Sequence, residues 1–220
     1  KLPAFSDIEA GVRASRDAGA DGIALINTLN ALSGIDLETH RPLPSVAGKS
    51  AFGGLSGRAV KPVALRCVAL AAGASPLPVS GMGGIYDWRD SAEFLLAGAS
   101  TLQICSAVME HGYGVIDDLC RGLGAYLDRQ GWNAPADAVG RALPHLVAHA
   151  ELSRGARVVA ACRQERCLRC GACATSCRDG GYQAISWAPG ETPRVDQEAC
   201  DGCGLCVGIC PVGCLELEER

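Results

Sequence analysis

The feature that most constrains how this chain can fold is a cysteine pattern that occurs twice near its C-terminus. Cys-x2-Cys-x2-Cys-x3-Cys begins at Cys167 and again at Cys200. Bacterial ferredoxins hold [4Fe–4S] clusters with this spacing, because three thiolates on one tight loop reach three corners of a cubane. The pattern predicts two clusters in a small α+β ferredoxin-like domain over residues 161–220. The predicted ligands are Cys167, Cys170, Cys173, Cys177, Cys200, Cys203, Cys206 and Cys210.

In this pattern the fourth cysteine of each run crosses to the other cluster. We therefore expect one cluster on Cys167, Cys170, Cys173 and Cys210, and the other on Cys200, Cys203, Cys206 and Cys177. Glycines at 171, 202 and 204 suit loops whose backbone wraps closely around an inorganic core. Pro211 follows the second run, whereas Arg178 follows the first.

The other cysteine-rich alternatives are a secreted disulfide domain and a pair of zinc sites. Ten of the 13 cysteines lie between Cys162 and Cys214, a density that disulfide domains also reach. Zinc pairs, however, usually come as two CxxC units a dozen or more residues apart, without a third cysteine three residues on. With no signal-peptide pattern, we expect a reducing cytoplasm and cysteines used for iron–sulfur ligation. Cys162 and Cys214 lie outside both runs and are interpreted as packed or free thiols.

Charge and hydropathy argue against two classes of partner. The chain has 20 Lys and Arg residues against 24 Asp and Glu residues, with a pI near 5.6. Nucleic acids and anionic membranes both favour clustered positive charge, so neither is expected as a partner. No apolar run approaches the roughly 20 residues of a membrane span. The chain opens on Lys1, and we expect the true N-terminus to lie upstream.

Residues 1–130 alternate between short apolar segments and longer amphipathic ones. We predict strands at 23–27, 77–80 and 101–105, with helices at 8–19, 61–72, 88–96 and 116–129. This order predicts parallel βαβ units and an α/β fold, with glycine-rich loops at 53–57 and 81–84 following strands. Because a closed barrel needs eight strands, the prediction is the C-terminal half of a (β/α)8 barrel, whose first half is either absent from this sequence or supplied by another chain. Residues 131–160 are predicted as a linker, with a weakly helical segment from Leu143 to Ala161.

Several strings together resemble one enzyme family. They are Asn-Thr-Leu-Asn-Ala-Leu-Ser-Gly-Ile-Asp from Asn27, Gly-Gly-Leu-Ser-Gly from Gly53, Ser-Gly-Met-Gly-Gly-Ile from Ser80, and Leu-Gln-Ile-Cys-Ser-Ala from Leu102. The chain resembles the FMN barrel of dihydropyrimidine dehydrogenases, above all the FMN/iron–sulfur subunit of the bacterial NAD-dependent form, N-terminally truncated. The likeness continues through Cys-Arg-Asp-Gly-Gly-Tyr-Gln-Ala-Ile from Cys177, so it covers nearly the whole chain.

The resemblance implies a role for each matching residue. Lys1 would lie at the flavin, where a cation stabilises the anionic reduced ring. Asn27 and Thr28 would bind the substrate, because an amide and a hydroxyl can satisfy the imide edge of uracil or thymine. The implied FMN-binding positions are Gly57, Met82, Gly83, Gly84, Cys105 and Ser106. The family's catalytic cysteine lies on the absent first half of the barrel, so no catalytic residue is expected in these 220 residues.

The activity implied by the resemblance is the reduction of uracil or thymine to 5,6-dihydropyrimidines. Electrons from NAD(P)H would enter on a partner subunit that binds FAD, because this chain has no GxGxxG fingerprint. They would then cross the two clusters to FMN, in an enzyme expected to be an oligomer. Two alternatives stay open: a dihydroorotate dehydrogenase-like flavin oxidoreductase, and a non-catalytic ferredoxin-type electron-transfer protein.

Overall fold

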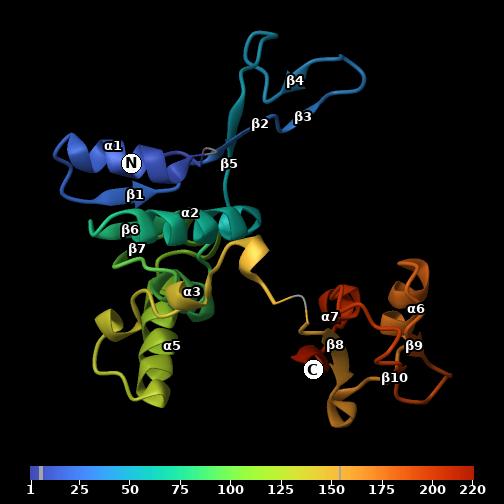
Figure 1. Cartoon of the computed structure of the whole chain (residues 1–220). Helices are drawn as coiled ribbons and strands as arrows, with labels where there is room; N and C mark the ends of the chain where they lie inside the picture. The colour runs from blue at the N-terminus through green and yellow to red at the C-terminus, as the bar shows by residue number, and fades with distance from the viewer. Residues whose placement is uncertain (5–6, 154) are drawn as a thin grey trace. The chain divides into compact units, whose positions relative to one another are not determined.

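The computed structural model describes residues 1–4, 7–153 and 155–220 (Figure 1). This part of the chain divides into two compact units, Lys1–Leu146 and Val147–Arg220. The division falls inside the segment predicted as a linker, and each unit is described below by itself. Among the described residues, no helix combines the length and the apolar character needed to cross a membrane.

The N-terminal unit confirms the predicted alternation of strands and helices. Its strands are β1 (Ile23–Leu25), β2 (Leu29–Ala31), β3 (Gly34–Ile35), β4 (Pro42–Leu43), β5 (Gly53–Leu55), β6 (Val79–Met82) and β7 (Thr101–Gln103). Its α-helices are α1 (Ile8–Asp17), α2 (Lys61–Ala74), α3 (Trp88–Leu96), α4 (Ser106–His111) and α5 (Gly114–Gln130). Short 3-10 turns are η1 (Arg58–Val60), η2 (Pro135–Ala138) and η3 (Leu143–His145).

The central sheet of this unit is parallel. Within the described residues, β1, β6 and β7 form a three-stranded sheet in the order β1-β6-β7, with Ile23 opposite Val79 and Ser80 opposite Thr101. Leu2 adds a parallel bridge to Leu25 beyond β1. Because all these segments run the same way, their carboxyl ends meet at one edge of the sheet. Any site built from strand ends must therefore lie at that edge.

Local capping and burial fix the helices against this sheet. Asp7 accepts a hydrogen bond from the Ala10 amide at 2.9 Å and so caps α1, while Asp87 and Asp90 form a capping box at the start of α3. Leu25 of β1 and Phe94 of α3 are fully buried in the core. Burying one such side chain contributes about 1.5–3 kcal/mol relative to leaving it exposed. The core therefore holds the strand ends at a fixed spacing.

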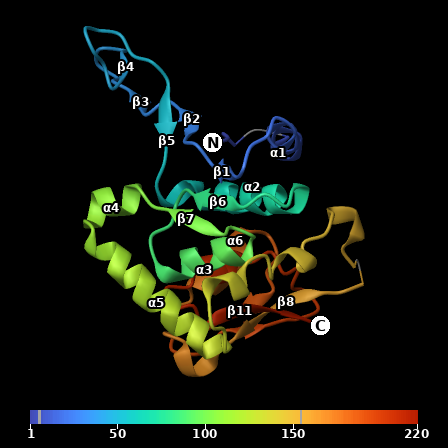
Figure 2. The same ribbon diagram turned by 90° about the vertical axis from the view of Figure 1, so that its left-hand side faces the viewer.

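A long β-arm, residues 29–55, extends away from the rest of the unit (Figures 1 and 2). At its base β2 pairs antiparallel with β5, and β3 pairs with β4 further out. The prediction of a glycine-rich loop at 53–57 is thus wrong for Gly53–Leu55, which is β5. A Cβ on Gly54 would lie 2.2 Å from Thr28 Oγ1, so glycine permits β5 to pass this close to Thr28.

The C-terminal unit contains β8 (Val158–Cys162), α6 (Ala172–Asp179), β9 (Ile185–Ser186), β10 (Arg194–Val195), α7 (Leu205–Ile209) and β11 (Leu215–Glu219). The turns η4 (His149–Glu151) and η5 (Gln164–Arg166) complete it. Strand β8 pairs antiparallel with β11 along its whole length. The helix predicted from Leu143 to Ala161 is therefore wrong: two 3-10 turns are followed by a strand, and residue 154 lies outside the described residues. The valines that begin β8 favour an extended backbone, and β11 supplies its hydrogen-bonding partner.

The two cysteine runs adopt the same local structure. Gly171 and Gly204 both have φ near 75°, and each immediately precedes a helix, α6 or α7. That left-handed conformation suits glycine. In each run the turn at this glycine separates the second cysteine, which precedes it, from the third cysteine, which lies in the helix that follows. Cysteine side chains make up much of the buried core of this unit, alongside residues such as Val159 and Leu215. A unit with so small an apolar core is the kind that bound metal commonly stabilises.

Candidate functional site

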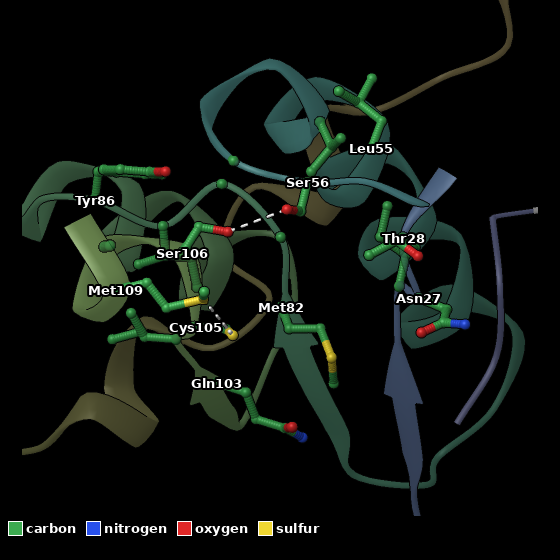
Figure 3. A pocket seen from close by; sticks show the side chains of 18 of the residues that line it. Asn27, Thr28, Leu55, Ser56, Met82, Tyr86, Gln103, Cys105, Ser106 and Met109 are labelled. Atoms are coloured by element: carbon green, nitrogen blue, oxygen red, sulfur yellow. Dashed lines mark hydrogen bonds between the residues drawn. The ribbon is translucent and has the colours of Figure 1, made fainter. Parts of the chain in front are cut away.

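A cavity of about 280 Å³ lies at the carboxyl edge of the parallel sheet (Figure 3). The structure brings into its wall every residue that the sequence singled out for flavin and substrate: Lys1, Asn27, Thr28, Gly57, Met82, Gly83, Gly84, Cys105 and Ser106. Figure 3 shows Asn27 and Thr28 on one side of Met82, with Cys105 and Ser106 on the other. The roles of these residues remain predictions, but their convergence on one cavity is a property of the structure.

Each strand of the sheet delivers residues to this cavity. Asn27 and Thr28 lie two and three residues after the end of β1, the loop from Gly83 follows β6, and Cys105 and Ser106 lie after β7. Lys1 reaches the same edge because Leu2 runs alongside β1, donating to the Ala24 carbonyl at 2.7 Å and accepting from the Asn27 amide at 3.0 Å. Binding residues of β/α barrels lie at this end of the strands.

The loop after β6 approaches its neighbours so closely that side chains are excluded. Gly83 and Gly84 have φ of 118° and 79°, values that L-residues rarely adopt. A Cβ on Gly84 would lie 2.7 Å from Lys61 Cβ and 2.9 Å from the Lys61 backbone nitrogen. The two glycines therefore present bare backbone to the cavity, which suits close approach to a phosphate.

A buried ion pair holds this loop in place. The Asp90 carboxylate accepts hydrogen bonds from the backbone amides of Tyr86 at 2.8 Å and Asp87 at 3.0 Å, and it pairs with Lys61. Lys61 also contacts Glu93 at 2.7 Å. Burial alone would raise the pKa of Asp90, but the hydrogen bonds from Lys61 and the two amides outweigh it and lower the pKa. The ionised Asp90 thus connects Lys61, at the start of α2, to the loop between β6 and α3, which forms part of the cavity wall.

Other side chains line the cavity that sequence reasoning missed. Ser106 Oγ lies 3.3 Å from Ser56 Oγ, as the upper dashed line in Figure 3 shows. Gln103 also lines the wall and donates to Ser80 Oγ at 2.8 Å. Ser56 stands beside Gly57, and Gln103 is the last residue of β7, two residues before Cys105. Position next to a predicted site residue at a strand end was the signal that could have found both.

Tyr86 forms one boundary of the cavity through a small network of its own. Its hydroxyl donates to Glu110 at 2.5 Å, and the Arg58 guanidinium lies 4.0 Å from its ring centroid. Burial and then the Glu110 contact raise the pKa of Tyr86, which keeps the phenol protonated. Cys105, in contrast, contacts the Met109 thioether, with the two sulfurs 3.9 Å apart. A thioether cannot act as a base, which agrees with treating Cys105 as a binding residue rather than a nucleophile.

The cysteine runs of the C-terminal unit surround two small voids. The first is lined by Cys167, Cys170, Cys173 and Cys210, with Cys214 beside them, and the second by Cys177, Cys200, Cys203 and Cys206. Each void thus receives three cysteines from one run and the last cysteine of the other. This is the arrangement expected from the crossed spacing. At each void the four cysteines that come from the two runs are a donor set that fits a [4Fe–4S] cluster.

Backbone amides point at several of these sulfurs. The Ala160 amide donates to Cys200 Sγ at 3.4 Å and the Ala184 amide to Cys177 Sγ at 3.2 Å. Burial raises the pKa of Cys206 to about 11. For Cys210 burial also acts to raise the pKa, but hydrogen bonds from the amides of Cys214 and Val212 lower it to about 7. Because a bound metal requires thiolates, loading these voids releases protons and is favoured by rising pH.

Comparison with known proteins gives each unit a counterpart. Residues 1–127 match the dihydroorotate dehydrogenase family, and residues 160–217 match a 4Fe-4S dicluster domain. The first match contains every predicted flavin and substrate residue, and the second contains all eight predicted cluster ligands.

Three individual relatives cover different shares of the chain. The NAD-dependent dihydropyrimidine dehydrogenase subunit PreA of Escherichia coli K12 is 42% identical over 99% of this chain and 54% of its own length. The catalytic subunit of dihydroorotate dehydrogenase B (NAD(+)) from Pyrococcus abyssi is 44% identical over 64% of the chain and 46% of its own length. The chloroplastic dihydropyrimidine dehydrogenase (NADP(+)) of Arabidopsis thaliana is 37% identical over 68% and 37%. The chain therefore spans about half the length, or less, of these curated relatives.

Proposed function

The chain belongs to the dihydroorotate dehydrogenase family, and from that premise we propose that it is the FMN and iron–sulfur part of a dihydropyrimidine dehydrogenase. One observation carries this proposal. A strand-end cavity and two voids, each lined by four of the predicted cluster cysteines, occur in the same chain, and a dihydropyrimidine dehydrogenase subunit is similar to it over both units. The reaction proposed is the reduction of uracil or thymine to 5,6-dihydropyrimidines.

We propose that residues 1–130 are the C-terminal half of a (β/α)8 barrel. The parallel order β1-β6-β7, with Leu2 bridged to β1, supports consecutive barrel strands. The rest of the barrel would come from sequence upstream, and a relative of about twice this length is consistent with that. The family's catalytic cysteine would lie on that upstream half.

The proposed FMN site is the cavity at the sheet edge. Backbone amides of Gly83, Gly84 and Ser106 would receive the phosphate, and Gly57 and Met82 would border the ring. Lys1 would place positive charge beside the pyrimidine end of the flavin. When bound there, FMN supplies the step that joins two single electrons into a hydride.

Asn27 and Thr28 are the proposed substrate-binding residues. The Asn27 amide has both a donor and an acceptor, and the Thr28 hydroxyl can act as either. Together they match the alternating C=O and N–H edge of a pyrimidine. The close passage of β5, with Gly54 against Thr28, supports a fixed position for the Thr28 side chain.

We propose two clusters in the C-terminal unit: cluster I on Cys167, Cys170, Cys173 and Cys210, and cluster II on Cys177, Cys200, Cys203 and Cys206. They would carry electrons from a partner subunit that oxidises NAD(P)H on FAD. The Escherichia coli relative is named as a subunit of an NAD-dependent enzyme, which supports the existence of a partner subunit.

A second candidate substrate class has one observation in its favour. The dihydroorotate dehydrogenase B subunit of Pyrococcus abyssi is 44% identical to this chain over 141 residues. Its match covers 64% of this chain, against 99% for the dihydropyrimidine dehydrogenase subunit. The cysteine-rich unit is therefore what favours pyrimidine reduction.

The substrate assignment is tested by Asn27→Ala in protein that includes the upstream half. Loss of the amide leaves a buried polar edge unpaired, at about 1–3 kcal/mol per group. The catalytic efficiency for uracil should therefore fall roughly 5- to 150-fold while FMN content stays unchanged. Asn30→Ala on β2, an exposed asparagine outside the cavity wall, is the matched control and should have no effect. Unchanged uracil kinetics in Asn27→Ala would remove this residue from the substrate site.

A further inference from the structure

Two cysteines outside the eight predicted cluster ligands lie next to two of those ligands. Cys162 ends β8, and Cys214 immediately precedes β11. The antiparallel pairing of these strands places Cys162 opposite Leu215, and the Arg163 amide donates to the Cys214 carbonyl at 2.7 Å. Residues 52 positions apart in the sequence are thus held together by main-chain hydrogen bonds.

The sulfur atoms at this end of the two strands are close enough to share one metal ion. The Sγ atoms of Cys162, Cys167 and Cys214 all lie within 4.8 Å of one another. Cys210 Sγ lies 3.4 Å from Cys214 Sγ. Four thiolates bound tetrahedrally to Zn²⁺ at about 2.3 Å are about 3.8 Å apart, which is within the range found here. Small side-chain movements would bring the sulfurs to one centre.

We propose that Cys162, Cys167 and Cys214, with Cys210 in the fourth position, form a mononuclear site for a thiophilic divalent cation such as Zn²⁺. A donor set made only of sulfur selects soft or borderline cations and disfavours Mg²⁺ and Ca²⁺, which prefer oxygen. Cys214 is 3% exposed, and a buried thiolate can be balanced by a metal ion in place of solvent. Binding converts the thiols to thiolates and releases their protons to water.

The site shares Cys167, Cys210 and Cys214 with the lining of the first void. Two of these, Cys167 and Cys210, are predicted ligands of cluster I, and the other two ligands, Cys170 and Cys173, are left unused. A cation bound there therefore excludes cluster I, a consequence that rests on the proposed cluster ligands. Cluster II has no ligand in common with the site. The mononuclear site thus acts as a switch in assembly: a zinc-loaded chain keeps cluster II, and its electron path is interrupted at cluster I.

Two cysteine substitutions separate the two uses of this region. Cys170→Ser removes a ligand of cluster I that the mononuclear site does not use, and Cys170 is exposed, so the packing is preserved. Cys162→Ala removes a ligand of the mononuclear site that cluster I does not use. The variants, their double mutant and the unmodified chain are purified anaerobically from cells grown with added zinc, and iron, sulfide and zinc are measured.

For Cys170→Ser we expect about four iron and one zinc per chain, and for Cys162→Ala about eight iron without zinc. The double mutant should keep about four iron and lose at least about tenfold in zinc. The four irons of cluster II report that the unit is still folded. Zinc that persists in the double mutant, or is absent from Cys170→Ser, would overturn the site. Failure of the cluster assignment alone would instead leave Cys170→Ser with unchanged iron.

If Cys170→Ser loses all iron, a second comparison decides the question. The unmodified chain and Cys162→Ala are freed of clusters by an anaerobic chelator and titrated with Co²⁺. The proposal requires the visible absorption of tetrahedral thiolate-bound Co²⁺ in the unmodified chain, and at least about tenfold weaker binding in Cys162→Ala. Equal affinities in the two chains would contradict it.

Discussion

Replacing Asp90 by asparagine tests whether the buried ion pair holds the loop at the cavity. Asp90 is 6% exposed and receives the Tyr86 and Asp87 amides as well as Lys61. Asparagine keeps the size and one acceptor oxygen but removes the charge. Hydrogen bonds to charged groups contribute about 1.5–3 kcal/mol, and breaking a buried pair costs about 3–5 kcal/mol. Because the Lys61 side chain is one quarter exposed and keeps Glu93, we expect a loss of about 2–3 kcal/mol.

The assay is thermal and urea unfolding of Asp90→Asn, followed by tryptophan fluorescence. For a unit of this size the loss corresponds to a fall in Tm of about 4–12 °C. The pKa of Asp90 is lowered in the folded chain from its ordinary value of 3.8. Its contribution is therefore fully present above that pH and is lost as the pH falls through the folded pKa. The difference in the free energy of unfolding between the native chain and Asp90→Asn should be constant near neutrality and should shrink below pH 3.8.

Glu93→Gln is the matched control, since Glu93 contacts the same lysine but is 46% exposed. Exposed pairs contribute about 1 kcal/mol or less, so this change should have little effect. The reasoning would be refuted if the two variants lost equal stability. It would also be refuted if the stability lost by Asp90→Asn did not depend on pH.

Two further substitutions test the cavity and the clusters. Gly84→Ala should cut FMN content at least about tenfold in protein with the upstream half, because the new Cβ meets the Lys61 backbone and φ is positive. Gly53→Ala, which meets nothing within 4 Å, is its control. Cys210→Ser should remove cluster I and leave about four iron with the spectrum of cluster II; loss of the cluster on the second run alone would show that the ligation is not crossed.

Periodicity alone predicted the elements whose signals are local. Helix α3 was predicted at Trp88–Leu96 and is found there, because Asp87 and Asp90 supply a capping box in the sequence itself. Strand β6 was predicted two residues early. Its start at Val79 is set by pairing with Ile23 of β1, a contact that the local sequence does not encode.

The errors have a common physical cause, which is pairing between distant segments. Gly53–Leu55 has little intrinsic strand preference and becomes a strand because β2 lies beside it. The segment that contains Val158–Cys162 includes alanines that favour a helix, yet it pairs with β11. The same pairing brings Cys162 close to Cys214. The cluster of sulfur atoms that these two cysteines form with Cys167 could therefore not be predicted from cysteine spacing.

Which residues lie together was easier to predict than the strands, because strand ends and cysteine spacing are themselves sequence features. Lys1, Asn27 and Cys105 lie far apart in the chain but all follow or flank parallel strands, so they meet at one edge. Ser56 was missed because it reaches the cavity from the end of the β-arm, whose course depends on the pairing of β2 with β5.

Anaerobic reoxidation of the chemically reduced protein tests the proposed activity most directly, since it needs no NAD(P)H-oxidising partner. Protein that includes the upstream half is reduced with dithionite, freed of excess reductant, and mixed with uracil, thymine or orotate while flavin and cluster absorbance are recorded. We expect uracil and thymine to restore the oxidised spectrum and to yield the 5,6-dihydropyrimidine, whereas orotate should do neither. Reoxidation by orotate but not by uracil, or by none of the three, would contradict this expectation.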